Sequence, residues 1–424
     1  MNTFENDKKP KQDFTTPQDR AILRELAEKV AAIAALNIQD EKKQLWRNLN
    51  GLKPQRPMVC IDQVCWNEIN VEDKLTLKCE DPECRKYEDV FRKILYRWEY
   101  FPVDMVVEPF IKVHKAVTNT VFGIVRQEHT LNTPGKEAVV SHKFVNQFKS
   151  MDDLEKIKEP KITHDINETR RRMEKAAWLF DGIMPLREEG VEPYLSVWDT
   201  ISSWMGVEGA LYGLIDEPEM MEAIVKKMVS GYISMLDQLE DQGVLCHSQA
   251  LIHCTGAFTD DLPSKTFNPE KPVTKDIWMF GLAQMFSTVS PEMFEEYEIK
   301  PMKPIFERFG LVYYGCCDPL DGKMNEVKKI PGLRKVSMSP WANRERGAAG
   351  IGKDYVFSSK PNPAYLATTV FNEELVRNDL KSIMDVCKKN SCPLEFILKD
   401  LSTVNNQPER LWKWAKIAME IVQE

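Results

Sequence analysis

Helical periodicity dominates the start of the chain. Between residues 17 and 50, apolar side chains such as Leu23, Leu26 and Val30 recur at spacings of three and four, which is the repeat of one helix face. Similar patterns predict helices at 84–99, 166–188, 217–241, 291–308, 321–330, 342–350, 371–389 and 408–423. Most of the chain is therefore expected to consist of helices separated by shorter non-helical segments.

Short apolar runs lie between these helices and predict buried strands. They cover residues 56–62, 103–113, 194–197, 244–253, 311–314, 334–339, 355–358 and 394–398. Strands that alternate with helices of this length indicate parallel β-α-β units. The pattern predicts a closed (β/α)8 TIM barrel over residues 51–424. An N-terminal tail and helix over residues 1–50 is expected to precede the barrel.

One stretch breaks the alternation. Residues 118–125 and 137–148 are rich in β-branched and aromatic side chains, and a Thr-Pro-Gly sequence at 133–135 separates them. This pattern is typical of a β-hairpin, so we expect a hairpin insertion in the barrel at about 115–165. Residues 259–276 predict a long loop, and long loops in compact domains are often functional.

Composition narrows the class of protein. The chain of 424 residues is 43% hydrophobic and 29% charged, with a formal net charge of −8, so nucleic acid and anionic membranes are disfavoured as partners. No apolar run is long enough to span a membrane, and residues 1–20 lack the apolar stretch of a secretory signal. Ten irregularly spaced cysteines suit a reducing, cytoplasmic setting. No Gly-x-Gly-x-x-Gly motif or phosphate loop is present.

Polar and aromatic side chains recur directly after the predicted strands. In α/β barrels the active site lies at the carboxyl ends of the strands, so these residues are candidates for the site. They are Asp62, Trp66, Glu68, Trp198, His253, Cys316, Cys317, Asp318, Trp341 and Lys360, together with Gln284, which precedes the helix cap at Ser290.

The adjacent thiols of Cys316 and Cys317 are the sharpest of these features. Thiolates are preferred zinc ligands, and a catalytic zinc typically takes three protein ligands. Neighbouring residues on a straight strand point to opposite faces, but Gly315 and Pro319 favour a turn here. The third ligand stays open, with His253, Cys254, Asp318 and Glu68 as candidates. A buried structural role for one of the thiols also stays open, because free cysteines are often buried.

The other candidates also have structural explanations. His253 is either a site residue or a satisfied structural histidine. Lys360 stands in a Pro-containing loop, where it is either an anion anchor or a solvated side chain. The tryptophans would line a flat pocket or pack in the core.

A run of ordered motifs resembles a known family. Ser290-Pro291-Glu292 resembles a helix start of the uroporphyrinogen decarboxylase superfamily. The segments Tyr314–Leu320, Leu333–Ser337, Ser339–Trp341 and Ser359–Pro363 are similar to a branch grouped with corrinoid-dependent methyltransferases, including those that demethylate phenyl methyl ethers. The likeness is good over 280–424 and weaker over 55–115.

The resemblance implies a zinc-dependent methyltransferase that passes a methyl group to the corrinoid of a partner protein. It implies catalytic roles for Cys316, Cys317, Asp318 and Gln284, with the two thiols as metal ligands. The remaining candidates would bind a small methyl donor, and a homodimer is expected from the superfamily. Two alternatives stay open, namely a metal-free decarboxylase or lyase that uses Lys360, Asp62 and His253, and a non-catalytic binding protein.

The sequence also departs from its relatives. Tyr314-Gly315-Cys316 stands where some relatives have His-x-Cys, Ser358-Ser359 stands near an expected third ligand, and Met285 stands where a glutamate often follows the glutamine. The Arg-rich stretch that binds substrate carboxylates in the decarboxylases is replaced by Asp62-Gln63-Val64-Cys65-Trp66. Decarboxylation of uroporphyrinogen, the tetrapyrrole that gives the superfamily its name, is therefore not expected.

Overall fold

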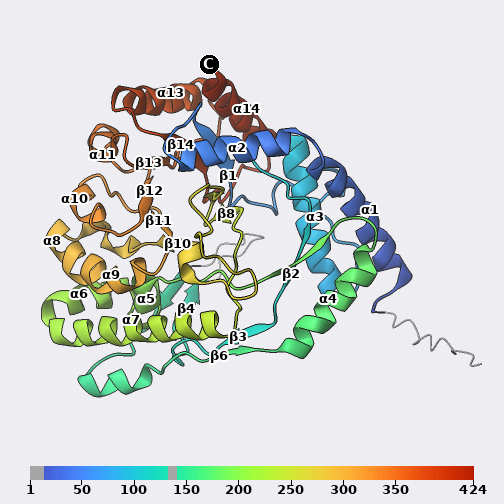
Figure 1. Ribbon diagram of the computed structural model, residues 1–424. Coiled ribbons are helices and arrows are strands. Elements are labelled where there is room, and N and C mark those ends of the chain that lie inside the picture. Colours follow the sequence, from blue (N-terminus) through green and yellow to red (C-terminus); the bar gives the residue numbers. More distant parts are fainter. Residues whose placement is uncertain (1–13, 132–140) are drawn as a thin grey trace, which may run out of the picture.

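Helices and strands alternate through most of the described chain. The computed structural model describes residues 14–131 and 141–424, and Figure 1 shows its ribbon. The helices are α1 (Pro17–Ala34), α2 (Ile38–Asn50), α3 (Pro82–Tyr100), α4 (Ile166–Phe180), α5 (Val197–Met205), α6 (Val207–Asp216), α7 (Pro218–Asp241), α8 (Pro291–Phe294), α9 (Lys300–Phe306), α10 (Met324–Val327), α11 (Arg344–Ile351), α12 (Ala364–Ala367), α13 (Glu373–Lys389) and α14 (Glu409–Gln423). The strands are β1 (Met58–Ile61), β2 (Ile111–His114), β3 (Val117–Asn119), β4 (Glu128–Leu131), β5 (Ser141–Phe144), β6 (Ile162–His164), β7 (Leu186–Glu189), β8 (Leu251–Ile252), β9 (Thr255–Gly256), β10 (Trp278–Gly281), β11 (Leu311–Tyr314), β12 (Leu333–Met338), β13 (Val356–Ser359) and β14 (Leu394–Leu398).

A curled sheet of six parallel strands carries the architecture. Its order is β1-β14-β13-β12-β11-β10, and each neighbouring pair is parallel. Helices α11, α13 and α14 lie on the outside of the curl (Figure 1). Because the strands are parallel, their carboxyl ends share one rim, and residues 315–318 and 399–400 follow two of these ends.

The prediction of a closed barrel is wrong, because the remaining segments do not complete the ladder. Between 103 and 113 only β2 is a strand, and it pairs with β7 in a separate two-stranded sheet. Residues near 104 meet β1 through one backbone bond, Asp104 N to Val59 O at 3.1 Å. The Asp104 carboxylate takes the Val59 N–H at 2.8 Å. The Asp104 carboxylate thus takes the place of a backbone acceptor from a neighbouring strand. The sheet ends at β1, and the result is a half-barrel.

Two further predicted strands are wrong for local reasons. Residues 194–197 lead into α5, because the Ser196 hydroxyl accepts the Asp199 N–H at 3.2 Å and caps that helix. The run 244–253 contains only the short strand β8, plus a bridge from Leu245 to Val191. The helix predicted over 166–188 ends at Phe180, and β7 follows it.

The predicted insertion contains paired antiparallel strands. β4 pairs with β5, so the first arm of the predicted hairpin is at 128–131 rather than 118–125. β3 pairs with β6 instead, and both pairs are antiparallel. The predicted turn at 133–135 lies outside the described residues. The limits of the insertion and of the N-terminal unit stay predictions.

The concave side of the sheet is filled rather than open. The hairpin β8–β9 lies inside the curl (Figure 1), and Ile252 and Cys254 pack there with Trp46 of α2 and Tyr313 of β11. A side chain at Gly256 would collide with the Trp46 ring, so only glycine permits this approach. The hairpin thereby brings residue 253 to the rim of the sheet. Within the described ranges, no helix is both long and apolar enough to cross a membrane.

Candidate active site

A turn directly after β11 places two thiols side by side. Gly315 has φ +92°, a left-handed conformation that glycine adopts without strain. The side-chain alternation of the strand ends there. The Sγ atoms of Cys316 and Cys317 lie 3.6 Å apart. The predicted turn is therefore present, and both sulfurs lie at the rim of the sheet.

Lys399 and His253 complete a compact group around Cys316. Lys399 follows β14, and its Nζ lies 2.9 Å from Cys316 Sγ. His253 sits in the β8–β9 turn, with Nε2 3.9 Å from the same sulfur and 3.3 Å from Lys399 Nζ. The His253 ring stacks on Phe280 of β10, with centroids 4.0 Å apart. Three separate parts of the chain therefore converge on one thiol.

The charges in this group favour an ionised thiol. The hydrogen bond from Cys317, with further contributions from His253 and Lys399, lowers the pKa of Cys316 to about 3. Burial acts to lower the pKa of His253, but the hydrogen bonds to Cys254 and Cys316 outweigh it and raise that pKa to about 9. Burial likewise opposes the charge of Lys399, yet the nearby thiolate leaves its pKa raised. At neutral pH the Cys316 thiolate therefore faces two cations, the Lys399 ammonium and the His253 imidazolium. These two lie 3.3 Å apart, and their repulsion acts to lower the pKa of His253 without cancelling its rise.

Backbone and carboxylate contacts hold the two cysteines in place. The Asp318 carboxylate accepts the Cys316 N–H at 3.1 Å, and the Ser337 hydroxyl donates to the Cys316 carbonyl at 2.7 Å. Cys317 Sγ lies 3.2 Å from Asp400 Oδ2 and 3.6 Å from Cys316 Sγ, so its one thiol proton is shared between these two acceptors. The hydrogen bond to Cys316 raises the pKa of Cys317. Cys316 is therefore the anionic sulfur and Cys317 the protonated one.

The donor types around Cys316 suit zinc, but their arrangement does not. Two thiols and an imidazole are familiar zinc ligands. Within residues 14–131 and 141–424, however, no group of three or more His, Cys, Asp or Glu side chains is arranged to hold a metal ion. The Cys316 thiolate is paired with the Lys399 ammonium instead. The zinc site stays a prediction.

The candidates after the first strand lie at the edge of a cavity or support a loop. Asp62 lines the cavity described below and forms an ion pair with Arg97 at 3.3 Å. Trp66 lies under the Arg97 guanidinium at 5.3 Å. The Glu68 carboxylate accepts the Val404 N–H at 2.8 Å and so fixes the loop after β14.

The remaining candidates are dispersed. Trp198 is fully buried against Phe286, and Trp341 is 73% exposed. Gln284 is exposed in a short turn after β10. The buried Lys360 ammonium contacts the Tyr313 hydroxyl and lies 3.0 Å from Ser358 Oγ. Of the predicted residues, the structure brings Cys316, Cys317, Asp318 and His253 together.

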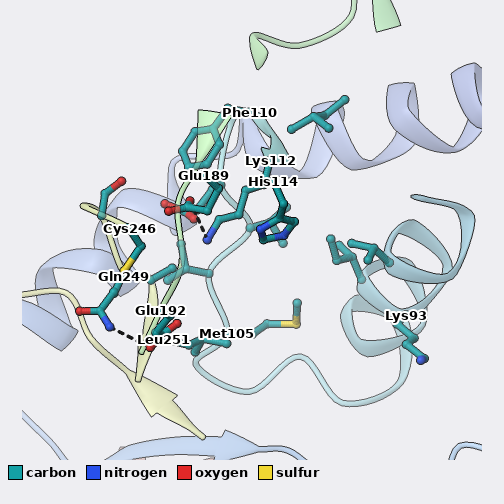
Figure 2. Close-up of a pocket in the computed structure, with 18 of the residues that line it drawn as sticks. Lys93, Met105, Phe110, Lys112, His114, Glu189, Glu192, Cys246, Gln249 and Leu251 are labelled. Atoms are coloured by element: carbon teal, nitrogen blue, oxygen red, sulfur yellow. Dashed lines mark hydrogen bonds and ion pairs between the residues drawn. The ribbon is translucent and has the colours of Figure 1, made fainter. Parts of the chain in front are cut away.

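A large cavity lies beside this group. Its volume is about 1110 Å³, and it extends from His253 and Phe280 past the β2–β7 sheet to α3. Figure 2 shows Glu189 of β7 directed toward Lys112 of β2, and Glu192 next to Gln249. The size suits a small-molecule ligand. Of Cys316, Lys399 and His253, it is His253 that lines this cavity, so its imidazole is the group that meets a space where a substrate can bind.

Lys399 and Asp400 are the site residues that sequence reasoning missed. Both directly follow the predicted strand 394–398. The rule that places sites at the carboxyl ends of strands would have identified them, if it had been applied to this last strand as well.

Comparisons with known proteins add little to this geometry. No protein-family model matches the sequence, and no curated protein matches it significantly. Among solved structures, the chain is similar to a methyltransferase from Methanosarcina mazei. The TM-score is 0.48 and the sequence identity 11%, over 89% of this chain and 98% of that one.

Proposed function

We propose that the chain is a methyltransferase that moves a methyl group from a small methoxy-type donor to a nucleophilic acceptor. The observation that carries this proposal is the group of Cys316, His253 and Lys399 at the mouth of the half-barrel, beside a cavity of ligand size. The motif run from Tyr314 to Pro363 supports the choice of methyl transfer among group-transfer reactions. For the acceptor, the same resemblance suggests cobalt(I) of a corrinoid carried by a partner protein.

The reaction requires help at the leaving oxygen. The acceptor uses its electron pair to form a bond to the methyl carbon. The carbon–oxygen bond breaks, and the electron pair of that broken bond stays on oxygen. His253 gives the oxygen its proton, as a general acid does. The donor's methyl group thus ends on the acceptor, and its oxygen leaves as a hydroxyl group.

Each member of the group has a role in this scheme. The Cys316 thiolate keeps His253 protonated, because an anion close to an imidazolium favours its charged form. Lys399 in turn keeps Cys316 ionised from a distance of 2.9 Å. Phe280 holds the His253 ring by stacking at 4.0 Å. Asp318 and Ser337 fix the backbone of Cys316.

A cobalt-based assay tests this function. The protein is mixed with a panel of methoxyarenes and free cobalt(I) corrinoid, and the change from cobalt(I) to methylcobalt is followed spectroscopically. We expect turnover with at least one donor and a loss of about 100-fold in Cys316→Ser and His253→Gln, the usual contribution of a general acid. Cys387→Ser, which changes a buried thiol of α13, is the matched control and should keep the activity.

The same assay separates the alternatives. Turnover that is unchanged in both site variants would place the chemistry elsewhere. Release of carbon dioxide from a carboxylated donor would favour a decarboxylase. Thermal stabilisation by a donor without any turnover would favour a binding protein.

A further inference from the structure

Lys399 occupies the space that a metal at this site would need. Its side chain is buried, with 3% exposed. The ammonium lies 2.9 Å from Cys316 Sγ, 3.3 Å from His253 Nε2 and 3.3 Å from Asp400 Oδ2. It therefore contacts two of the three donors that a zinc ion bound to Cys316, Cys317 and His253 would use.

A zinc ion and this ammonium are incompatible neighbours. Zinc bonds thiolate at about 2.3 Å and imidazole at about 2.0 Å. With Lys399 as it stands, a zinc ion bonded to Cys316 would lie within roughly 5 Å of Nζ, whatever its direction. A dication and a monocation at that separation repel each other strongly in a buried site.

The charges of the group already balance without a metal. The Cys316 thiolate and the Asp400 carboxylate together offset the Lys399 ammonium and the His253 imidazolium, and Cys317 keeps its proton. Binding zinc through both sulfurs would require Cys317 to lose that proton and Lys399 to leave. Lys399 has little freedom to leave, because it is buried and contacts three polar groups.

We propose that Lys399 replaces the metal in this chain, so that the centre is a metal-free thiolate paired with an ammonium, and that Lys399 excludes divalent metals from it. Lys399 is then a positioning residue that acts through Cys316. The inference deepens the proposed function, because it names what compensates the thiolate, but it does not depend on which group is transferred.

Zinc titration tests the inference directly. Wild type, Lys399→Met and Lys399→Arg are purified under reducing conditions, and each is titrated with Zn²⁺ alone. We expect wild type to hold much less than one zinc per chain. Lys399→Met, which keeps the length of the side chain and loses its charge, should gain one site with at least about tenfold tighter binding. Lys399→Arg keeps the charge and should not gain it.

A matched control and a spectroscopic readout make the result specific. Lys323→Met removes another buried lysine, whose ammonium contacts the Phe286 carbonyl, and should leave zinc binding at the wild-type level. Co²⁺ added to Lys399→Met should give thiolate-to-cobalt charge-transfer bands, which a purely structural effect would not produce. Lys399→Gln serves the same purpose if the Met variant does not fold.

Two results would overturn the inference. One is a stoichiometric zinc in wild type that resists a chelator. The other is a folded Lys399→Met or Lys399→Gln variant that binds zinc no better than wild type. Neither result depends on methyl transfer. A failed transfer assay together with the expected titration would therefore reject the function and retain the metal-free centre.

Discussion

Lys399 places its ammonium 2.9 Å from the sulfur of Cys316, although 83 residues separate them in the chain. The contact exists because β11 and β14 are parallel strands of one curled sheet, so that the residues after them meet at one rim. A thiolate held by an ammonium and an imidazole is a reactive arrangement, since cationic neighbours favour the ionised form of a thiol. The proposed function therefore depends on this pair.

The pH dependence of the reaction should show one limb in the working range. His253 has a pKa raised to about 9, and Cys316 one lowered to about 3. Between these values the acid is protonated and the thiol ionised. We expect kcat/KM to be flat between about pH 6 and 8 and to fall tenfold per pH unit above about 9.

The variant Cys316→Ser is the control for this decline of kcat/KM at high pH. In Cys316→Ser the anion beside His253 is lost, so the limb should move to lower pH in the residual activity. A wild-type limb near pH 6.5, the ordinary range for histidine, would contradict the assigned role of the imidazolium.

A buried ion pair inside the half-barrel should be essential for stability. Lys335 Nζ lies 2.7 Å from Glu395 Oε2 and 3.1 Å from Thr255 Oγ1, and both charged side chains are fully buried. Lys335→Met leaves the Glu395 carboxylate buried without its cation, and we expect a loss of about 3–5 kcal/mol in the free energy of unfolding.

The double variant distinguishes pairing from packing. Lys335→Met with Glu395→Leu removes both charges, and apolar replacement of a buried pair is often close to neutral. Urea unfolding should therefore show the double variant to be more stable than Lys335→Met alone. If the double variant loses as much stability as Lys335→Met and Glu395→Leu lose together when measured singly, the ion pair does not have the assigned role.

How far the sequence predicts the fold differs between the two halves of the chain. The strands near 311, 334, 355 and 394 were found because each is a short apolar run between clear helical patterns. The segments near 104 and 245 have similar runs, but near 104 the Asp104 carboxylate accepts the Val59 N–H in place of a ladder bond, and near 245 the backbone forms a single bridge to Val191. Apolar periodicity does not report that substitution, so a closed barrel was predicted where a half-barrel exists.

In the candidate site, too, some features follow from the local sequence and others depend on the tertiary structure. Local sequence around Gly315 predicted the turn and the paired thiols. Which of the rim residues reach Cys316 depends on the tertiary structure, because His253 lies in a hairpin inside the curl and Lys399 directly follows a distant strand. Trp198 was a reasonable candidate by position, but α5 directs it against Phe286 in the core.

Glu298 should make the stability of the fold depend on pH. It lies in the π-helical turn Glu295–Ile299, and Oε1 accepts the Tyr314 hydroxyl at 3.1 Å. Oε2 has no partner among the described residues. Burial raises the pKa of this carboxyl to about 8, from an ordinary value of 4.5.

The direction of the pH effect on stability follows from which state, folded or unfolded, holds the Glu298 proton at a given pH. The folded state retains it up to about pH 8, whereas the unfolded chain releases it above about pH 4.5. Stability is therefore highest below the lower value and declines as pH rises toward the upper one. Glu298→Gln should match wild type near pH 4.5 and be more stable at pH 8 by on the order of 3 kcal/mol. Chemical unfolding at the two pH values measures this, and a gain of equal size at both would contradict the assignment.

The most direct test of the account is the rate at which Cys316 is alkylated as a function of pH. Chloroacetamide is added to the folded protein, and modification of the peptide containing Cys316 is followed by mass spectrometry. A thiolate held by Lys399 should react at a nearly constant rate from pH 8 down to about 5, and Lys399→Met should lose that plateau. A wild-type rate that falls tenfold for each pH unit below about 8.5, as for an ordinary thiol, would contradict the ionised centre on which the account rests.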